Sequence, residues 1–221
     1  MRRVIALVVI LVAIGLVGCK KEVKPAGEQP TAAQNEAPAS FEWTEAPAVA
    51  AIPAGPVKMD ANGEKLEAKA VYFEPGFKEW RMVIHSAALK KPTSIRPRGQ
   101  FVSISLTDDP GPGKTIIKKL KYGNGYYQVK KPDDPEKTTS WNASNAYVIQ
   151  ITKWDVKPYD PKGSIFQSAG SASGRVAIVY KGSGNFKNSY AAGAFENVPV
   201  RYMGKPYWQR EKEKKEKQAK R

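Results

Sequence analysis

The sequence predicts an all-β protein, a single antiparallel β-sandwich of about eight strands, with a small β-barrel as the alternative. Between residues 63 and 207, short runs rich in β-branched and aromatic residues recur at nearly regular spacing. Clusters of Gly, Pro, Asn and Asp separate these runs. No stretch with helical periodicity lies between them, although βαβ units would require one.

The first predicted strands are separated by clear turn signals. Residues 68–73 and 80–87 are apolar runs on either side of Glu74-Pro75-Gly76. In residues 101–106 aliphatic side chains alternate with serine, which is typical of a strand with one buried face.

Residues 115–122 and 126–130 flank the sequence Gly123-Asn124-Gly125. Because Asn-Gly tolerates the positive φ angles of a type I′ turn, we expect these two strands to pair as a hairpin. The polar residues 131–144 are expected to form a long loop.

Residues 146–156 are apolar on both faces, which indicates a central strand. Residues 157–173 contain several Pro, Gly and Ser residues, so we expect a second long loop there. Residues 174–181 and 190–203 are the last predicted strands, with a bulge near Asn197, where the alternation shifts.

The domain, residues 63–207, has a predicted segment on each side. Residues 19–62 are rich in Pro and Ala, which predicts a disordered tether. Within it, Phe41 and Trp43 are expected to have no structural role, and the alternative is that they dock a partner. Residues 208–221 form a basic Lys/Glu-rich tail, expected to be a frayed helix without an apolar face.

The N-terminus carries the features of an export signal. Two arginines precede residues 4–17, an uncharged run that is shorter than the roughly 20 residues of a spanning helix. The only cysteine, Cys19, follows this run directly. It is preceded by small or aliphatic residues, namely Leu16, Val17 and Gly18.

This arrangement resembles the lipobox of bacterial lipoproteins, which signal peptidase II cleaves before the cysteine. The resemblance implies a signal peptide over residues 1–18 and acyl chains on Cys19 that anchor the protein to a membrane. Lys20, where inner-membrane lipoproteins tend to carry Asp, favours the outer membrane in a Gram-negative host. A soluble secreted protein and a short membrane anchor are the alternatives.

The sequence predicts no cofactor, metal site or catalytic site. With Cys19 acylated, the folded part has no thiol for a disulfide or a nucleophile. His85 is the only histidine and lies in an apolar run, which indicates a structural role rather than a catalytic triad. The aspartates lack the spacing of an EF-hand loop, and no segment suggests paired carboxyls.

The chain is strongly basic, with a net charge of +15. Removal of Arg2 and Arg3 with the signal peptide leaves 34 basic and 21 acidic residues, a net charge of +13. Such a surface can meet anionic head groups, cell-wall polymers or an acidic protein, whereas nucleic acid is not expected as a partner in the envelope.

A candidate ligand surface lies around the predicted hairpin. Its aromatic rings are expected mainly to fill the core, and stacking on sugars is the alternative. Its members are Tyr122, Tyr126, Tyr127, Trp141, Lys119 and Lys121.

We therefore expect a membrane-anchored envelope lipoprotein with a non-enzymatic binding or assembly role. Its expected partner is an envelope protein or a cell-wall polymer. A carbohydrate- or peptidoglycan-binding module is the first alternative, and a carboxylate-dependent hydrolase is the second.

Overall fold

The computed structural model describes residues 38–219. The signal peptide, the lipobox with Cys19 and the first part of the predicted tether lie outside the described residues. Within 38–219 the protein is mainly β, with 49% of residues in strands, which confirms the predicted fold class. The strands are β1 (Lys58–Ala61), β2 (Glu64–Glu67), β3 (Ala70–Pro75), β4 (Trp80–His85), β5 (Phe101–Ser105), β6 (Thr115–Tyr122), β7 (Gly125–Lys130), β8 (Thr138–Trp141), β9 (Ser144–Val156), β10 (Phe166–Tyr180) and β11 (Ser189–Met203).

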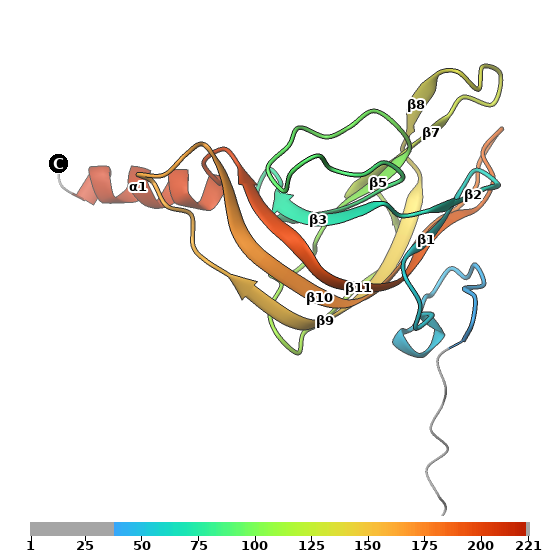
Figure 1. Ribbon diagram of the computed structural model, residues 1–221, viewed down its shortest axis with the longest axis horizontal. Coiled ribbons are helices and arrows are strands. Elements are labelled where there is room, and N and C mark those ends of the chain that lie inside the picture. Colours follow the sequence, from blue (N-terminus) through green and yellow to red (C-terminus); the bar gives the residue numbers. More distant parts are fainter. Residues whose placement is uncertain (1–37, 220–221) are drawn as a thin grey trace, which may run out of the picture. The chain divides into compact units, whose positions relative to one another are not determined.

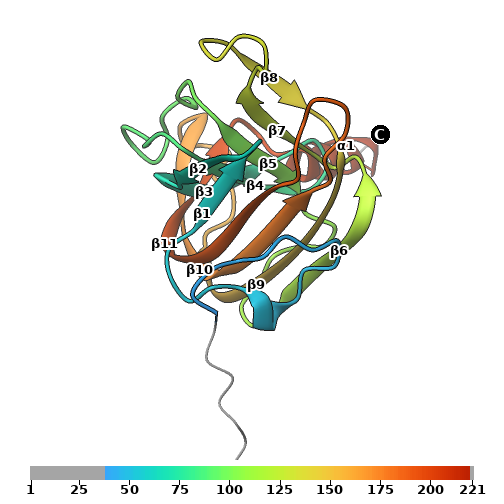
Figure 2. The same cartoon turned by 90° about the vertical axis from the view of Figure 1, so that its right-hand side faces the viewer.

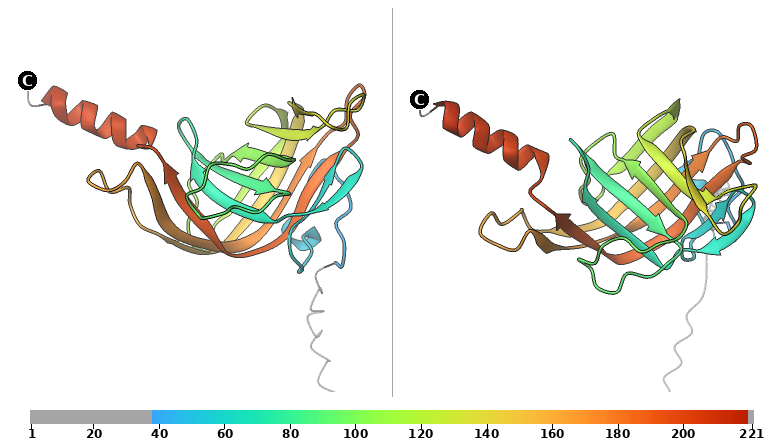
Figure 3. Two further views of the ribbon diagram at one scale, coloured as in Figure 1. Left: turned by 45° about the horizontal axis from the view of Figure 1, so that its top comes forward. Right: turned by 90° about the horizontal axis from the view of Figure 1, so that it is seen from above.

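All the strands belong to one sheet with the order β6-β9-β10-β11-β3-β4-β5-β7-β8, and β1 joins it by pairing with both β11 and β2. The pairs are antiparallel except for β11 with β3, which meet in parallel at Val200 and Phe73. The sheet curls into a half-barrel, so its two halves face each other as the layers of a sandwich would (Figures 1 and 3).

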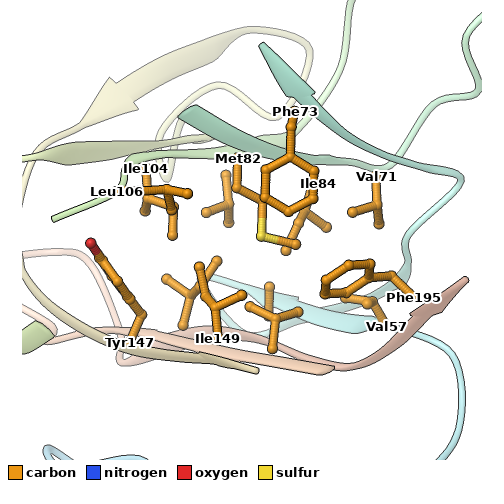
Figure 4. Close-up of a cluster of buried hydrophobic side chains, with 14 of the residues drawn as sticks. Val57, Val71, Phe73, Met82, Ile84, Ile104, Leu106, Tyr147, Ile149 and Phe195 are labelled. Atoms are coloured by element: carbon orange, nitrogen blue, oxygen red, sulfur yellow. The ribbon is translucent and has the colours of Figure 1, made fainter. Parts of the chain in front are cut away.

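The main core fills the space inside the curl. Alternate side chains of β3, β4 and β5, such as Phe73, Met82 and Ile104, point toward Ile149 on β9 and Phe195 on β11 (Figure 4). Each of these five side chains is buried. Because successive side chains of a strand point to opposite faces, the outer face of each half needs a separate cover.

Residues 38–57, which we call the strap, cover the outer face of β9, β10 and β11 (Figure 2). Phe41 and Ile52 are buried there against aliphatic side chains of these strands. Arg175 Nη2 of β10 donates to the carbonyl oxygens of Val49 and Ile52 at 3.2 and 2.6 Å. Trp43 Nε1 donates to the Tyr180 carbonyl oxygen at 3.1 Å.

The prediction of a disordered tether is therefore wrong for residues 38–62. Its two aromatic residues dock on the chain's own sheet rather than on a partner. The strap passes so close to β11 that a Cβ atom at Gly193 would lie 2.6 Å from the Pro56 carbonyl oxygen, and Gly193 has a φ of +145°. The tether prediction also missed β1, which forms a hairpin with β2 through Asn62 and Gly63, both at positive φ.

Three other sequence expectations need correction or extension. Strands β6 and β7 do not form a hairpin: Gly123 and Asn124 do have positive φ, yet β6 pairs with β9, and β7 pairs with β5 and β8. The expected loop 131–144 contains β8, and the expected loop 157–173 contains the first half of β10. Gly170 is needed in β10 because a Cβ atom there would collide with the Asp155 carbonyl oxygen of β9.

The expected irregularity in the last strand is confirmed. The pairing of β10 with β11 shifts register around Asn197, which has a φ of +48°. A bulge of this kind bends a strand and increases its twist, as the curl of β11 requires.

The tail forms helix α1 (Tyr207–Ala219), in agreement with the expected helix. Its first turn is held by aromatic contacts, with Trp208 5.4 Å from Trp80 and Tyr207 5.5 Å from Phe77, measured between ring centroids. Beyond them α1 extends away from the sheet (Figure 1). Across residues 38–219, no helix combines the length and apolar character needed to span a membrane.

Candidate functional site

The predicted ligand surface divides into an exposed and a buried part. Lys119, Lys121 and Tyr122 are exposed on β6, a strand at one end of the sheet order. Tyr126 is half-buried on β7, where its hydroxyl accepts a hydrogen bond from Arg96 Nη1 at 3.0 Å. Strands β6 and β7 do not pair with each other, because β6 pairs with β9 and β7 pairs with β5 and β8.

The two remaining aromatics of that set are core residues. Tyr127 is fully buried, and Trp141 stacks on Phe186 with 5.0 Å between ring centroids. Both rings fill the core, as mainly expected, and the alternative of stacking on a sugar is wrong for both because neither ring is accessible. The neighbouring Lys118 is also buried, donates to the carbonyl oxygens of Lys121 and Asn145, and has its pKa lowered by burial to about 8.

A large surface concavity lies elsewhere. It is an open groove of about 1050 Å³ between β2, the end of the loop 86–100 and the β7–β8 hairpin. This volume is at the upper end of the range for ligand sites. Its lining carries both signs of charge, from the acidic residues Glu64, Glu67 and Glu136 and the basic residues Lys65, Lys69, Arg98 and Lys130.

A cyclic hydrogen-bond network connects the two sides of this groove. Gln100, which is buried, donates from Nε2 to Glu64 Oε2 at 2.9 Å and accepts at Oε1 from the Lys130 main-chain N–H at 3.1 Å. Lys130 Nζ lies 3.0 Å from Glu64 Oε1. The network joins β2 to β7, which do not pair with each other in the sheet. Because these bonds fix the two sides of the groove relative to each other, the groove is pre-formed.

His85 and Phe101 support the floor of the groove. The His85 ring stacks on Phe101, accepts at Nδ1 from the Ala87 N–H at 2.9 Å, and lies 3.1 Å from the Pro97 carbonyl oxygen through Nε2. Since Nδ1 accepts, Nε2 carries the proton and donates. Both ring nitrogens are thus engaged by the main chain, which agrees with the structural role expected for His85.

A buried charged cluster fixes the loop 86–100 from its other side. Glu74 on β3 accepts from Arg96 of this loop at 3.0 Å and from Arg201 Nη2 of β11 at 2.8 Å. Arg201 is 1% exposed and also donates from Nη1 to the carbonyl oxygens of Pro92 and Ser94 at 3.0 and 2.7 Å. The cluster holds the loop in place, and with it the residues that line the groove.

The far wall of the groove is the β7–β8 hairpin. Gln128 Nε2 donates to Thr138 Oγ1 at 2.8 Å, and Ser140 Oγ donates to Gln128 Oε1 at the same distance. These cross-strand bonds keep polar groups of β7 and β8 in fixed positions beside the opening.

The groove could not be predicted because β2 and β8, which form two of its sides, lie in segments expected to be irregular or close to the tether. One local signal was present: Asn62-Gly63 is the same type of turn dipeptide as Asn124-Gly125, and it does connect paired strands. The role of Gln100 had no local signal, since its partners are 36 and 30 residues away.

Comparison with protein-family models, curated proteins and solved structures finds no match.

Proposed function

We propose that this protein is a lipid-anchored envelope protein without enzymatic activity that binds a partner protein through the groove between β2 and the β7–β8 hairpin. The observation that carries the proposal is the groove itself, a pre-formed concavity of about 1050 Å³ whose sides are joined by the Glu64–Gln100–Lys130 network. A site that is organised before binding loses little conformational entropy when the ligand binds.

The lining favours a protein partner over a sugar polymer. Sugar-binding surfaces present exposed aromatic rings, whereas the groove is lined mainly by charged and polar side chains, and Phe101 in its floor is only 8% exposed. Two lining lysines are neutralised locally, Lys65 by Asp60 at 2.6 Å and Lys130 by Glu64 at 3.0 Å. A ligand with charges of both signs matches this pattern.

The placement in the envelope comes from the sequence around Cys19. Under this proposal, the acylated cysteine holds the protein at a membrane, and residues 20–37 connect it to the strap. The strap then joins the anchor to the sheet that carries the groove.

The proposal is tested by crosslinking in intact cells, followed by purification of the protein with its bound partner. The groove variant is Lys69→Glu with Arg98→Glu, which reverses two exposed charges of the lining. The matched control is Lys119→Glu with Lys121→Glu, which reverses two exposed charges on β6. Cys19→Ala removes the acylation site.

We expect capture of one envelope protein to fall about tenfold or more in the groove variant, a loss of about 1.4 kcal/mol, and to persist in the β6 control. The Cys19→Ala protein should leave the membrane fraction and lose the partner. Capture that is lost only in the β6 control would place the ligand site on β6 instead. Capture of cell-wall fragments, unaffected by the groove variant, would overturn the proposed partner.

A further inference from the structure

Strand β2 has an unpaired edge. Among the described strands it pairs only with β1, in the register Ala61–Glu64 and Met59–Leu66. Just beyond this ladder, the Ala68 N–H donates to the Val57 carbonyl oxygen at 3.1 Å. In an antiparallel ladder every second residue bonds to the partner strand, and the residues between point their N–H and C=O groups the other way.

This alternation identifies which groups are free. The bond between Ala68 and Val57 fixes residues 64, 66 and 68 as those that bond to β1 and its extension. Lys65 and Glu67 therefore direct their main-chain N–H and C=O groups toward the opposite edge. The next residue of that series is Lys69. Its N–H donates at 2.8 Å to the carbonyl oxygen of His85, which is the last residue of β4.

The opposite edge faces the groove. Strand β4 ends at His85 and β5 begins at Phe101, and one further main-chain bond joins the Ser86 N–H to the Gln100 carbonyl oxygen at 3.0 Å. The strands β4 and β5 therefore do not extend alongside Lys65 and Glu67 of β2. The groove is lined by residues 64–67 on this side and by Gln128 and Lys130 on the other. A peptide in the groove can therefore continue the sheet from the edge of β2.

We propose that the ligand is an extended segment of the partner protein that adds to β2 as a further strand. This inference rests on the proposed function and specifies how the groove binds. The free N–H and C=O groups of Lys65 and Glu67 give affinity without regard to sequence, and the lining charges give specificity. The described residues offer no ion-pair partner to Lys69 and Arg98 or to Glu67 and Glu136, so the segment carries both acidic and basic side chains.

The test uses the full chain and a phage-displayed library of random peptides as the probe. A selected peptide is synthesised and titrated against wild type, Lys65→Pro and Lys65→Ala. Proline removes the N–H that faces the groove and leaves the main-chain bonds of β2 to β1 in place. Both variants lose the ion pair of Lys65 with Asp60 of β1, so the difference between them reports on the main-chain N–H. We expect Lys65→Pro to weaken binding about tenfold and Lys65→Ala to change it less than about threefold.

Amide hydrogen exchange provides a second readout that does not depend on a variant. With the peptide bound, the Lys65 and Glu67 amides should become protected, while those of Glu64 and Leu66 should be protected both with and without it. Peptides that need Lys69 and Arg98 but leave the Lys65 and Glu67 amides unprotected would overturn strand addition and leave the groove as the site. Peptides insensitive to Lys69→Glu with Arg98→Glu would contradict the proposed site as well.

Discussion

Replacement of Arg201 by Met should destabilise the protein strongly, because it removes the central donor of a buried cluster. Arg201 donates from Nε and Nη2 to Glu74 Oε2 at 3.1 and 2.8 Å, and from Nη1 to two carbonyl oxygens of the loop 86–100. Glu74 keeps only Arg96 after the change, and the carbonyl oxygens of Pro92 and Ser94 lose their donor.

The magnitude follows from these losses. Removing one partner of a buried ion pair costs about 3–5 kcal/mol. Each carbonyl left without a donor costs about 1–3 kcal/mol if water does not replace the bond. Because the loop can open to water at Pro92 and Ser94, we expect a total of about 4 kcal/mol. At an m-value of about 2 kcal/mol/M, the urea midpoint should fall by roughly 2 M.

The assay is equilibrium urea unfolding of wild type, Arg201→Met and a control variant. The control is Arg210→Ala, at an exposed residue of α1, and it should change the free energy of unfolding by less than about 0.5 kcal/mol. The double variant Arg201→Met with Glu74→Gln should be more stable than the sum of its single changes predicts, because it leaves no unpaired carboxylate at Glu74. A loss below about 1 kcal/mol for Arg201→Met, or strict additivity in the double variant, would refute the reasoning.

Three further perturbations test other parts of the structure. Ile52→Ala should lower the free energy of unfolding by about 2–5 kcal/mol, because Ile52 of the strap is fully buried against the sheet. The control Ile95→Ala, at an exposed residue, should have little effect in the same urea assay, and equal effects of the two variants would show that the strap is not packed. Gly193→Ala should cost about 1–3 kcal/mol through its positive φ and the contact with Pro56, measured by thermal unfolding, and an unchanged midpoint would contradict this close approach. Burial lowers the pKa of His85 below its ordinary value of 6.5, so below about pH 6.5 the unfolded chain binds a proton that the folded protein does not. The free energy of unfolding should therefore decrease as the pH is lowered, with a slope of at most about 1.4 kcal/mol per pH unit. This slope should vanish in His85→Gln, and a slope that persists in this variant would come from other groups.

Elements with a strong local pattern could be predicted from the sequence. The alternation in residues 101–106 corresponds to β5, and the two apolar faces of residues 146–156 correspond to β9, an internal strand of the sheet. The shift in alternation near Asn197 is a register shift in the structure. Each of these features depends on side chains within a few positions of one another.

Features that depend on distant partners could not be predicted in this way. Asn124-Gly125 has the conformation of a turn, but β6 gains more by pairing with the apolar β9, and local φ preferences do not select a strand's partner. Prolines in residues 38–57 indicate disorder by composition, yet the outer face of β9 and β10 supplies the apolar surface that orders them. The second apolar face of β9 was the sequence signal that such a cover exists.

The candidate site shows the same division. The charged residues that line the groove are ordinary surface residues by type, and only the fold places Glu64, Gln100 and Lys130 in contact. Tyr127 and Trp141 lie in the core, as mainly expected for the aromatic residues around the hairpin, whereas Tyr122 is exposed. Exposure of a single aromatic residue depends on the strand register, which short-range sequence patterns fix poorly.

Site-specific photocrosslinking in living cells tests the central claim most directly. A benzophenone amino acid placed at Thr138, which is exposed at the groove, samples the proposed ligand site, and the same amino acid at Tyr122 samples the exposed part of β6. We predict that Thr138 yields a covalent adduct with one envelope protein and that Tyr122 does not. An adduct formed from Tyr122 and not from Thr138 would contradict the assignment of the groove as the binding site.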